Sequence, residues 1–250
     1  MIPAPRALAT DARLTARSVV LSILLGAHPA SATSAELIRL TAGFDIKETT
    51  LRVALTRLVA AGDLVRSPTG YGLSPRLLER QRKQDAALDP PTVAWDGTWL
   101  AVVITSIGCD GQTRAAMRSG LSERRFAELR EGFWLRPSNI DVAIGGELTG
   151  RTRLLTVRDE RPGELAAMLW DLAGWARTGH GLLTEMNEAV DVASRFVVAA
   201  AMVRHLRRDP VLPSELLPPD WPGTRLRSRY SEFVDEISAR RQMRAPVILR

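Results

Sequence analysis

Residues 45–62, Asp-Ile-Lys-Glu-Thr-Thr-Leu-Arg-Val-Ala-Leu-Thr-Arg-Leu-Val-Ala-Ala-Gly, decide how the first part of this chain is expected to fold. Apolar residues recur every three or four positions, which is typical of an amphipathic helix. Asp45-Ile46-Lys47-Glu48 has the pattern of a capping box, with Glu48 at the third helical position and able to reach back to the cap amide. We therefore predict a helix that begins at this box and runs to about Ala61, where Gly62 stops it.

The two faces of this helix differ in chemistry. One face is apolar and is expected to pack on a core; it consists of Leu51, Ala54, Leu55 and Leu58. The opposite face is mostly polar and basic; it consists of Thr49, Arg52, Val53, Thr56 and Arg57. Hydroxyl and guanidinium groups can bond base edges and phosphates, so this second face predicts a helix that lies in the major groove of DNA.

The flanking segments place this helix in a larger motif. Thr15 can cap a helix through Leu25, and Thr33 or Ser34 can cap a short helix over residues 35–40 that Gly43 ends. After the helix, residues 64–66 and 71–73 surround a Ser-Pro-Thr-Gly turn, which predicts a short β-hairpin. Three helices followed by a hairpin predict a winged helix-turn-helix domain over residues 1–74.

Within this domain we assign eight residues to DNA contacts. The base contacts fall to Arg52 on a guanine and Val53 on a thymine methyl, with Thr49 and Thr56 on a base or a phosphate. Phosphate contacts that set the register are assigned to Lys47, Arg57, Arg66 and Tyr71. The alternative is a solvated helix in a winged helix that binds protein.

The distribution of charge agrees with a nucleic-acid-binding head. Residues 1–87 contain 12 Lys and Arg against 7 Asp and Glu, a net of +5, whereas residues 88–250 contain 22 against 21, a net of +1. A basic module beside a nearly neutral remainder suits a partner that is a polyanion. Surface arginines are common, so the charge alone leaves the partner open.

The rest of the chain divides into three further segments. Residues 75–91 form a connecting segment, in which residues 75–88 are expected to form a charged helix that Asp89-Pro90-Pro91 ends. Residues 92–160 show the order β-α-β-β-α-β of a ferredoxin-like domain: strands at 100–107, 126–129, 133–136 and 153–157, a helix at 112–121, and a short helix capped by Ser138. A helical interpretation of residues 122–131 is the alternative.

Residues 161–250 read as a helical C-terminal domain. Pro162 suits the first position of a helix through Trp175, and a turn at Gly179-His180-Gly181 is expected to follow. A long helix over residues 184–208, a proline-punctuated bridge over 213–221 and a terminal helix over 225–241 complete the segment. The predicted fold class is therefore α+β with several domains.

Candidates for catalysis and metal binding are weak, so we expect no enzyme and no metal site. His28, His180 and His205 lack metal-ligand spacing. The glycine-rich run 145–150 lacks the Lys-Ser/Thr of a phosphate loop and reads as a turn. Asp96 and Asp110 lie at the two ends of a predicted strand. The ordinary interpretation is that these aspartates favour turns. The alternative is that they hold a metal ion between two chains and act as a nuclease.

The remaining composition points to a cytoplasmic protein. The single cysteine, Cys109, allows no intrachain disulfide and is expected at the end of a strand. Residues 1–10 do not read as a signal peptide, and the most apolar stretch, residues 192–206, is too short and too charged to span a bilayer. The six tryptophans are expected to be mostly core anchors, some of which could line an apolar ligand pocket.

Four stretches in this order resemble the PaaX family of phenylacetate-degradation repressors. They are Leu-Arg-Val-Ala-Leu-Thr-Arg-Leu-Val-Ala-Ala-Gly at 51–62, Trp-Asp-Gly-Thr-Trp at 95–99, Gly-Phe-Trp-Leu-Arg-Pro at 132–137, and Pro-Ser-Glu-Leu-Leu-Pro-Pro-Asp-Trp-Pro-Gly at 213–223. The last is the most specific. Two stretches depart from the family: the wing at 67–72 is shorter and less basic, and residues 121–126 replace a glycine-aromatic-glycine stretch.

The resemblance implies a homodimeric repressor that binds double-stranded DNA at a near-palindromic operator. It also implies a middle domain similar in fold to small CRISPR-associated ferredoxin-like nucleases. An aryl-CoA or acyl-CoA thioester is implied as the effector that releases the DNA, in place of any permanent cofactor.

Overall fold

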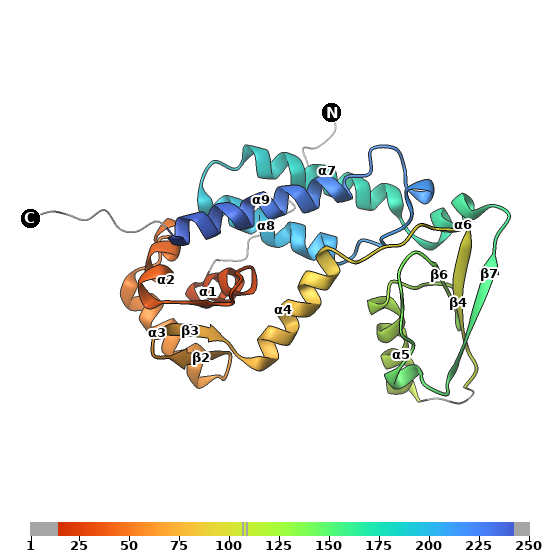
Figure 1. Ribbon diagram of the computed structural model, residues 1–250, viewed down its shortest axis with the longest axis horizontal. Helices are drawn as coiled ribbons and strands as arrows, with labels where there is room; N and C mark the ends of the chain where they lie inside the picture. The colour runs from red at the N-terminus through yellow and green to blue at the C-terminus, as the bar shows by residue number, and fades with distance from the viewer. Residues whose placement is uncertain (1–14, 107, 109, 243–250) are drawn as a thin grey trace, which may run out of the picture. The chain divides into compact units, whose positions relative to one another are not determined.

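The computed structural model describes residues 15–106, 108 and 110–242, and its contacts group them into two compact units (Figure 1). The first unit combines the residues up to Asp89 with Thr178–Arg207 and the segment from Pro222 onward. The second combines Pro90–Arg177 with Arg208–Trp221. The chain is a mixed α and β protein with two small antiparallel sheets. The division into four linear segments drawn from the sequence stays a prediction.

Capping side chains begin the first two helices, α1 (Ala16–Leu25) and α2 (Ser34–Thr41). The Thr15 hydroxyl accepts a hydrogen bond from the Ser18 amide at 3.1 Å. The Thr33 hydroxyl accepts from the Glu36 amide at 3.2 Å, and the Glu36 carboxylate accepts from the Thr33 amide at 2.6 Å. Each of these bonds satisfies an amide that the helix leaves without a partner. The predicted caps at Thr15 and Thr33 are confirmed.

The predicted capping box before α3 (Glu48–Ala60) is wrong. Lys47 is the N-cap residue and makes no side-chain cap bond. Asp45 instead adopts a left-handed conformation, with φ of 53°, at the end of a 3-10 turn, η1 (Ala42–Phe44). This turn moves the helix start two residues along the chain, so Glu48 stands at the first helical position, where it cannot reach back to a cap amide.

A three-stranded antiparallel sheet follows α3. Strands β2 (Leu64–Ser67) and β3 (Gly70–Leu73) form the predicted hairpin, and β1 (Ser31–Ala32) pairs with the free edge of β3. A Cβ on Gly70 would lie 2.2 Å from the Ala32 carbonyl oxygen, so only glycine permits this approach. The core beneath the sheet and the three helices includes Val20, Leu24, Leu51, Leu55 and Leu58.

Four long helices complete the first unit, and they are α4 (Pro75–Leu88), α7 (Leu172–Glu188), α8 (Val192–Leu206) and α9 (Gly223–Gln242). The first residues of α7 belong to the second unit. Helix α8 packs on α9, and α2 and α4 contact α9 and α8 respectively (Figure 1). The predicted extent of α4 is confirmed.

Two predictions for this helical region are wrong. The run Gly179-His180-Gly181 lies inside α7 and forms no turn. A Cβ on Gly179 would lie 2.7 Å from Pro222 Cγ, so close packing against the start of α9 uses a glycine that looked like a helix breaker. The predicted single helix over residues 184–208 is broken, because Asp191 caps α8 by accepting from the Ser194 amide at 2.8 Å.

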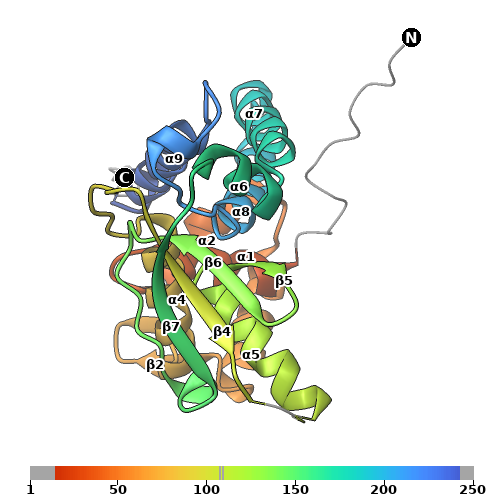
Figure 2. The ribbon, with the colours of Figure 1, turned by 90° about the vertical axis from the view of Figure 1, so that its right-hand side faces the viewer.

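The second unit is built on a four-stranded antiparallel sheet of order β5-β6-β4-β7 (Figure 2). Its strands and helices are β4 (Thr98–Ile104), α5 (Gly111–Glu123), β5 (Ala127–Arg130), β6 (Phe133–Pro137), η2 (Gly146–Leu148), β7 (Thr152–Arg158), α6 (Pro162–Leu169) and η3 (Ser214–Leu216). Alternate residues of β4 serve two cores. Trp99 and Ala101 pack with α6 and η3, whereas Val102 packs with Met117 and Leu121 of α5.

Several details of this unit differ from expectation. Ser138 begins no helix; its hydroxyl donates to the Thr98 carbonyl at 3.0 Å. The helical alternative for residues 122–131 is wrong, because β5 pairs with β6 there. Helix α6 ends at Leu169 and does not reach Trp175, since Asp171 starts α7 by accepting from the Gly174 amide at 2.8 Å. Cys109 lies outside the described residues. Every helix in the described part of the chain is too short or too polar to cross a membrane.

Candidate nucleic-acid interface

Helix α3 presents one buried and one exposed face. Leu51, Leu55 and Leu58 are at most 3% exposed, whereas the opposite residues are all exposed: Thr49, Arg52, Val53, Thr56 and Arg57. Val53 contributes an apolar side chain to the exposed face and is 51% exposed. The structure therefore brings the five predicted helix residues onto one solvent-facing surface.

Arg52 is held by an ion pair along this surface. Its Nε and Nη2 atoms donate to Glu48 Oε1 at 2.9 and 2.5 Å, one turn earlier in the helix. Both side chains are at least half exposed, so the pair is screened by water and weak. Thr56 donates its hydroxyl to the Arg52 carbonyl at 3.1 Å, which leaves the Thr56 oxygen as an acceptor toward solvent. Glu48 thus places a negative charge next to the guanidinium of Arg52, for which the sequence analysis predicts a contact with a guanine base.

A groove between α1 and α3 adds residues that the sequence analysis did not select. Thr15, Ala16 and Arg17 at the start of α1 line this groove together with Thr49, Thr50, Val53, Ala54, Arg57 and Leu58 of α3. The first amides of a helix carry partial positive charge and favour an anion. Arg17 stands two residues after the Thr15 cap, and this position beside a helix start was the signal in the sequence that could have identified it.

A buried aspartate ties Arg17 to the rest of the head. Asp63 Oδ2 accepts from Arg17 Nη2 at 2.8 Å, and Asp63 Oδ1 accepts from Arg76 Nη2 at 2.5 Å. The Asp63 side chain is 5% exposed, while both arginines remain more than 60% exposed. The Asp63 carbonyl also accepts from the Ser74 amide at 3.0 Å. One carboxylate therefore joins α1, the hairpin and the start of α4.

The hairpin holds two of the three remaining predicted residues, at positions that are paired between its strands. Arg66 of β2 and Tyr71 of β3 are directly opposite each other in the antiparallel register. Arg66 is exposed, whereas Tyr71 is half-buried and packs against the core of the head. Lys47, the cap residue of α3, is exposed. The basic side chains of Lys47 and Arg66 are thus accessible, whereas Tyr71 is only partly so.

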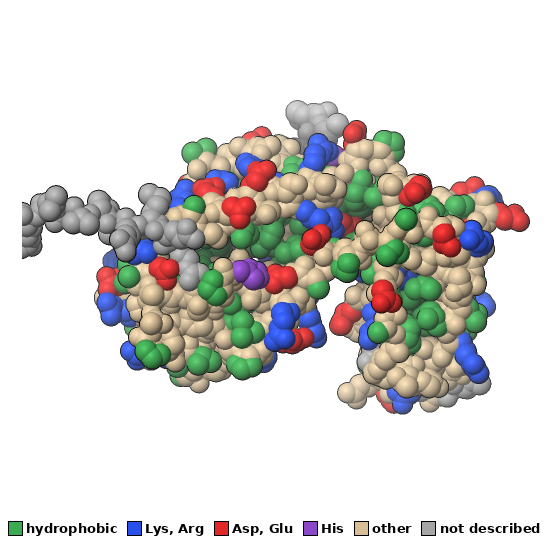
Figure 3. All heavy atoms as spheres, in the orientation of Figure 1, with side chains coloured by type: hydrophobic (Ala, Val, Ile, Leu, Met, Phe, Trp, Pro, Cys, Tyr) green, Lys and Arg blue, Asp and Glu red, His purple; other side chains and the backbone are tan. Residues whose placement is uncertain are grey.

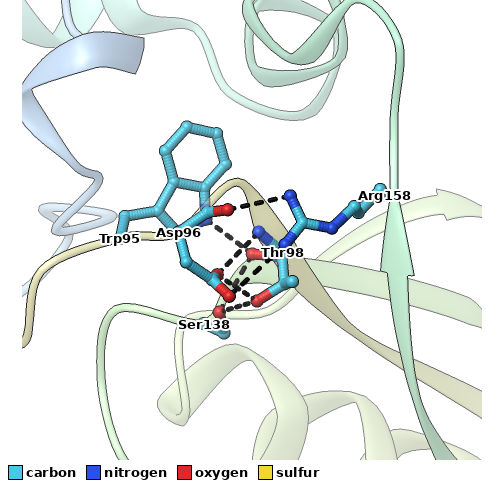
Figure 4. A network of polar contacts seen from close by, with 5 residues as sticks. All are labelled: Trp95, Asp96, Thr98, Ser138 and Arg158. Carbon is cyan, nitrogen blue, oxygen red and sulfur yellow. Dashed lines mark hydrogen bonds and ion pairs between the residues drawn. The ribbon is translucent and has the colours of Figure 1, made fainter.

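The two aspartates considered for a metal site are engaged in local structure. Asp96 Oδ1 accepts from the Thr98 amide at 3.0 Å and from its hydroxyl at 2.6 Å, and Arg158 donates to the Asp96 carbonyl at 2.9 Å (Figure 4). Asp110 caps α5 by accepting from the Thr113 amide at 2.8 Å. These Thr98 and Thr113 hydrogen bonds lower the pKa of the Asp96 and Asp110 carboxyls.

Other candidates for chemistry are likewise part of local contacts. His28 lies 3.0 Å from the Asp85 carboxylate, His180 lies 3.3 Å from Arg225, and His205 is buried in α8. The glycine-rich run 145–150 contains the 3-10 turn η2. In residues 15–106, 108 and 110–242, no three His, Cys, Asp or Glu side chains come together in a way that could hold a metal ion.

Comparisons with known proteins cover most of the chain. Family models match residues 15–77 (PaaX-like protein), residues 92–152 (PaaX protein central Cas2-like domain) and residues 174–244 (PaaX-like protein C-terminal domain). The solved structure of the uncharacterized protein Rv0674 from Mycobacterium tuberculosis is similar, with 61% sequence identity and a TM-score of 0.84. That match covers 91% of this chain and 97% of the other. The comparison with curated proteins gave no match.

Proposed function

Because this chain belongs to the PaaX-like family, a family of transcriptional regulators rather than enzymes, we propose that it binds double-stranded operator DNA through α3. The observation that carries this proposal is the exposed face of α3, where hydroxyl, guanidinium and methyl groups lie together opposite a buried leucine face. A helix with this division of chemistry fits the major groove, whose base edges offer acceptors, donors and thymine methyls.

The head is best interpreted as a winged helix-turn-helix domain. Helices α2 and α3 are joined by a short turn, and the β2–β3 hairpin follows directly after α3. In this interpretation α3 is the recognition helix and the hairpin is the wing. The second unit would be ferredoxin-like, which its strand order β5-β6-β4-β7 supports, with η2 in the place of a full second helix.

The proposed contacts divide into two groups. Arg52 and Val53 read a guanine and a thymine methyl, and Thr49 and Thr56 contact bases or phosphates. Lys47, Arg57, Arg66 and Tyr71 contact phosphates and set the register. Arg17 joins this second group, because it lies in the groove beside Arg57 and its side chain is 62% exposed.

Specificity is proposed to come from a homodimer on a near-palindromic operator. One recognition helix reads too few base pairs to select a single site in a genome, whereas two helices in successive major grooves read enough. The resemblance to PaaX repressors supports a repressor in the cytoplasm whose DNA binding an aryl-CoA or acyl-CoA thioester relieves. A ligand can do this only if it binds the two arrangements of the protein with different affinity.

Fluorescence anisotropy on the chain's own promoter tests DNA binding. We expect specific binding whose logarithm of affinity falls linearly with the logarithm of salt concentration, because phosphate contacts release counterions. The variant Arg57→Ala should reduce the salt slope by about one, whereas Arg208→Ala, which removes an exposed arginine far along the chain, should not. Absence of salt-dependent binding at low salt would show that the exposed face of α3 serves a protein partner instead.

A further inference from the structure

The first unit contains an apolar cavity of about 210 Å³ away from the exposed face of α3. The C-terminal half of α1 forms one wall, and α8 and α9 form the opposite wall. Its apolar lining includes Ile23, Leu40, Phe196, Phe233 and Ile237. Figure 3 shows hydrophobic side chains (green) along the seam between α9 and the N-terminal helices. The cavity is therefore enclosed by segments that are distant in the sequence.

Among the residues that the structure describes, three arginines line the same cavity, and no acidic residue does. Arg80 comes from α4, and Arg204 and Arg207 come from the end of α8. Within the described residues, none of the three guanidinium groups forms an ion pair or hydrogen bond. By contrast, other arginines of the same unit, such as Arg195, have carboxylate partners. The cavity thus combines an apolar body with unneutralised positive charge, which is complementary to an amphipathic anion.

A neutral hydrogen-bond donor completes the lining. Tyr230 of α9 contributes to the cavity wall. Burial, and secondarily the charge of Asp85, raises the pKa of Tyr230 to about 12. Its hydroxyl therefore keeps its proton at neutral pH and can donate to an oxygen anion.

The size of the cavity limits the ligand. An apolar protein cavity of about 150 Å³ is large enough for benzene, so a cavity of about 210 Å³ accommodates a group somewhat larger than one aromatic ring. We propose that this cavity binds a small carboxylate with an apolar body, whose anionic group lies against Arg80, Arg204 and Arg207. Octanoate is a suitable probe of this class.

The arrangement of charge separates a free carboxylate from a CoA thioester. A thioester carbonyl is neutral, and the phosphates of coenzyme A lie at the far end of a long flexible arm. A carboxylate attaches its charge directly to the apolar body, so a small cavity lined by apolar side chains together with exposed arginines suits it. Guanidinium groups bind carboxylates through charge-assisted hydrogen bonds, often two in parallel.

The cavity shares helix α1 with the proposed DNA-binding surface. Ile23 and Leu25 line the cavity, and Leu24 lies both on the cavity and in the core that contains Leu51 and Leu55 of α3. A ligand that shifts α1 therefore changes the support of α3. This regulatory consequence rests on the proposed function, whereas ligand binding itself does not.

Isothermal titration calorimetry of octanoate against the full chain tests the binding site. We expect one octanoate per chain, with the uncharged 1-octanol binding more weakly. The double variant Arg204→Gln/Arg207→Gln should weaken octanoate binding about tenfold or more, because it removes two charged donors. Arg208→Gln is the matched control: it removes the exposed arginine that follows Arg207 in the chain and does not line the cavity, and octanoate affinity should stay at the wild-type value.

A second variant tests the site by filling the cavity with a larger side chain. Ala200→Phe places an aromatic ring in the cavity and should abolish binding, with folding verified by circular dichroism and the thermal midpoint. Equal octanoate affinity in the wild type and the double arginine variant would overturn the carboxylate site, as would the absence of octanoate binding. The promoter assay keeps the two proposals apart. DNA binding without octanoate binding refutes only this site, and octanoate binding without DNA binding refutes only the proposed function.

Discussion

Arg52 and Arg57 lie on the same exposed face of α3, but their proposed roles differ. Arg52→Ala should cost about 1–3 kcal/mol of binding free energy and relax the base preference at one position, because a guanine loses its bidentate partner. Arg57→Ala should weaken binding to all sequences alike, because phosphates are the same at every step. Selection of binding sites from a random library with both variants measures the difference. An unchanged motif with Arg52→Ala would mean that Arg52 contacts no base.

Glu48 is the acidic neighbour of this surface, and its removal should strengthen DNA binding. The variant Glu48→Gln keeps a polar side chain at the first position of α3 but removes a negative charge that pairs with Arg52. We expect a several-fold gain in promoter affinity at low salt and a loss of stability of at most about 0.5 kcal/mol, since exposed pairs of this spacing contribute little. Reduced affinity would show that Glu48 positions Arg52 for its contact.

Tyr230 is expected to make the protein less stable as the pH rises into the alkaline range. Its pKa is raised to about 12 in the folded chain from 10 as the ordinary value. Since the unfolded chain loses this proton first, the stabilisation is complete below pH 10 and is lost as the pH rises from 10 to 12. The wild type should therefore lose about 2 kcal/mol more than Tyr230→Phe across this interval.

Urea unfolding at a series of pH values measures this difference. Every other titratable group is common to the wild type and Tyr230→Phe, so the difference between their two stability curves isolates the Tyr230 hydroxyl. Parallel stability curves for the wild type and Tyr230→Phe would mean that the Tyr230 hydroxyl is not buried in the folded chain.

Two helix glycines respond differently to alanine, because only one lies against another helix. A Cβ on Gly179 of α7 would lie 2.7 Å from Pro222 Cγ and 3.0 Å from Leu226 Cδ1. Gly179→Ala should therefore destabilise the chain by about 1–3 kcal/mol through overpacking. Gly163 of α6 has open space around its Cα, so Gly163→Ala should be neutral or stabilising by up to about 1 kcal/mol.

Chemical denaturation of both variants gives the comparison directly. Equal effects at the two positions would mean that α7 does not pack on the start of α9 as described. The same pair of glycines shows why helix propensity alone misplaced a turn at residues 179–181: the cost of glycine in a helix is about 1 kcal/mol, and close contact between α7 and α9 requires that glycine.

The proposed dimer predicts the spacing of the two half-sites in its operator. If two copies place their α3 helices in successive major grooves, the half-sites lie about one helical turn apart, roughly 10 base pairs centre to centre. Insertion of about half a turn between the half-sites should abolish tight binding, because the second helix then faces the wrong side of the duplex. Anisotropy titrations on such operators, with the oligomeric state from analytical ultracentrifugation, check this. Equal affinity for one half-site and for the full operator would indicate binding by a single chain.

Local patterns in the sequence were sufficient to predict much of the fold of residues 15–88. The Thr15 and Thr33 caps, the end of α3 at Gly62, the β2–β3 hairpin and the extent of α4 are confirmed. In each case the stabilising contact is made within a few residues, as in a capping hydroxyl and an amide three positions later. The division of α3 into a leucine face and a polar face has the same origin, because helical periodicity decides which side chains share a face.

Contacts between distant residues decided the rest. The predicted capping box before α3 does not form, because Asp45 ends the 3-10 turn after α2 and is not the N-cap residue of α3. Arg17 joins the proposed DNA-binding surface only because Asp63, 46 positions later, accepts its hydrogen bond and α1 packs beside α3. The arginine-lined cavity exists only because α1, α4, α8 and α9 meet in one unit. Periodicity and capping act over a few residues, whereas a cavity or a shared ion pair depends on which helices meet, and that is set by the packing of the entire unit.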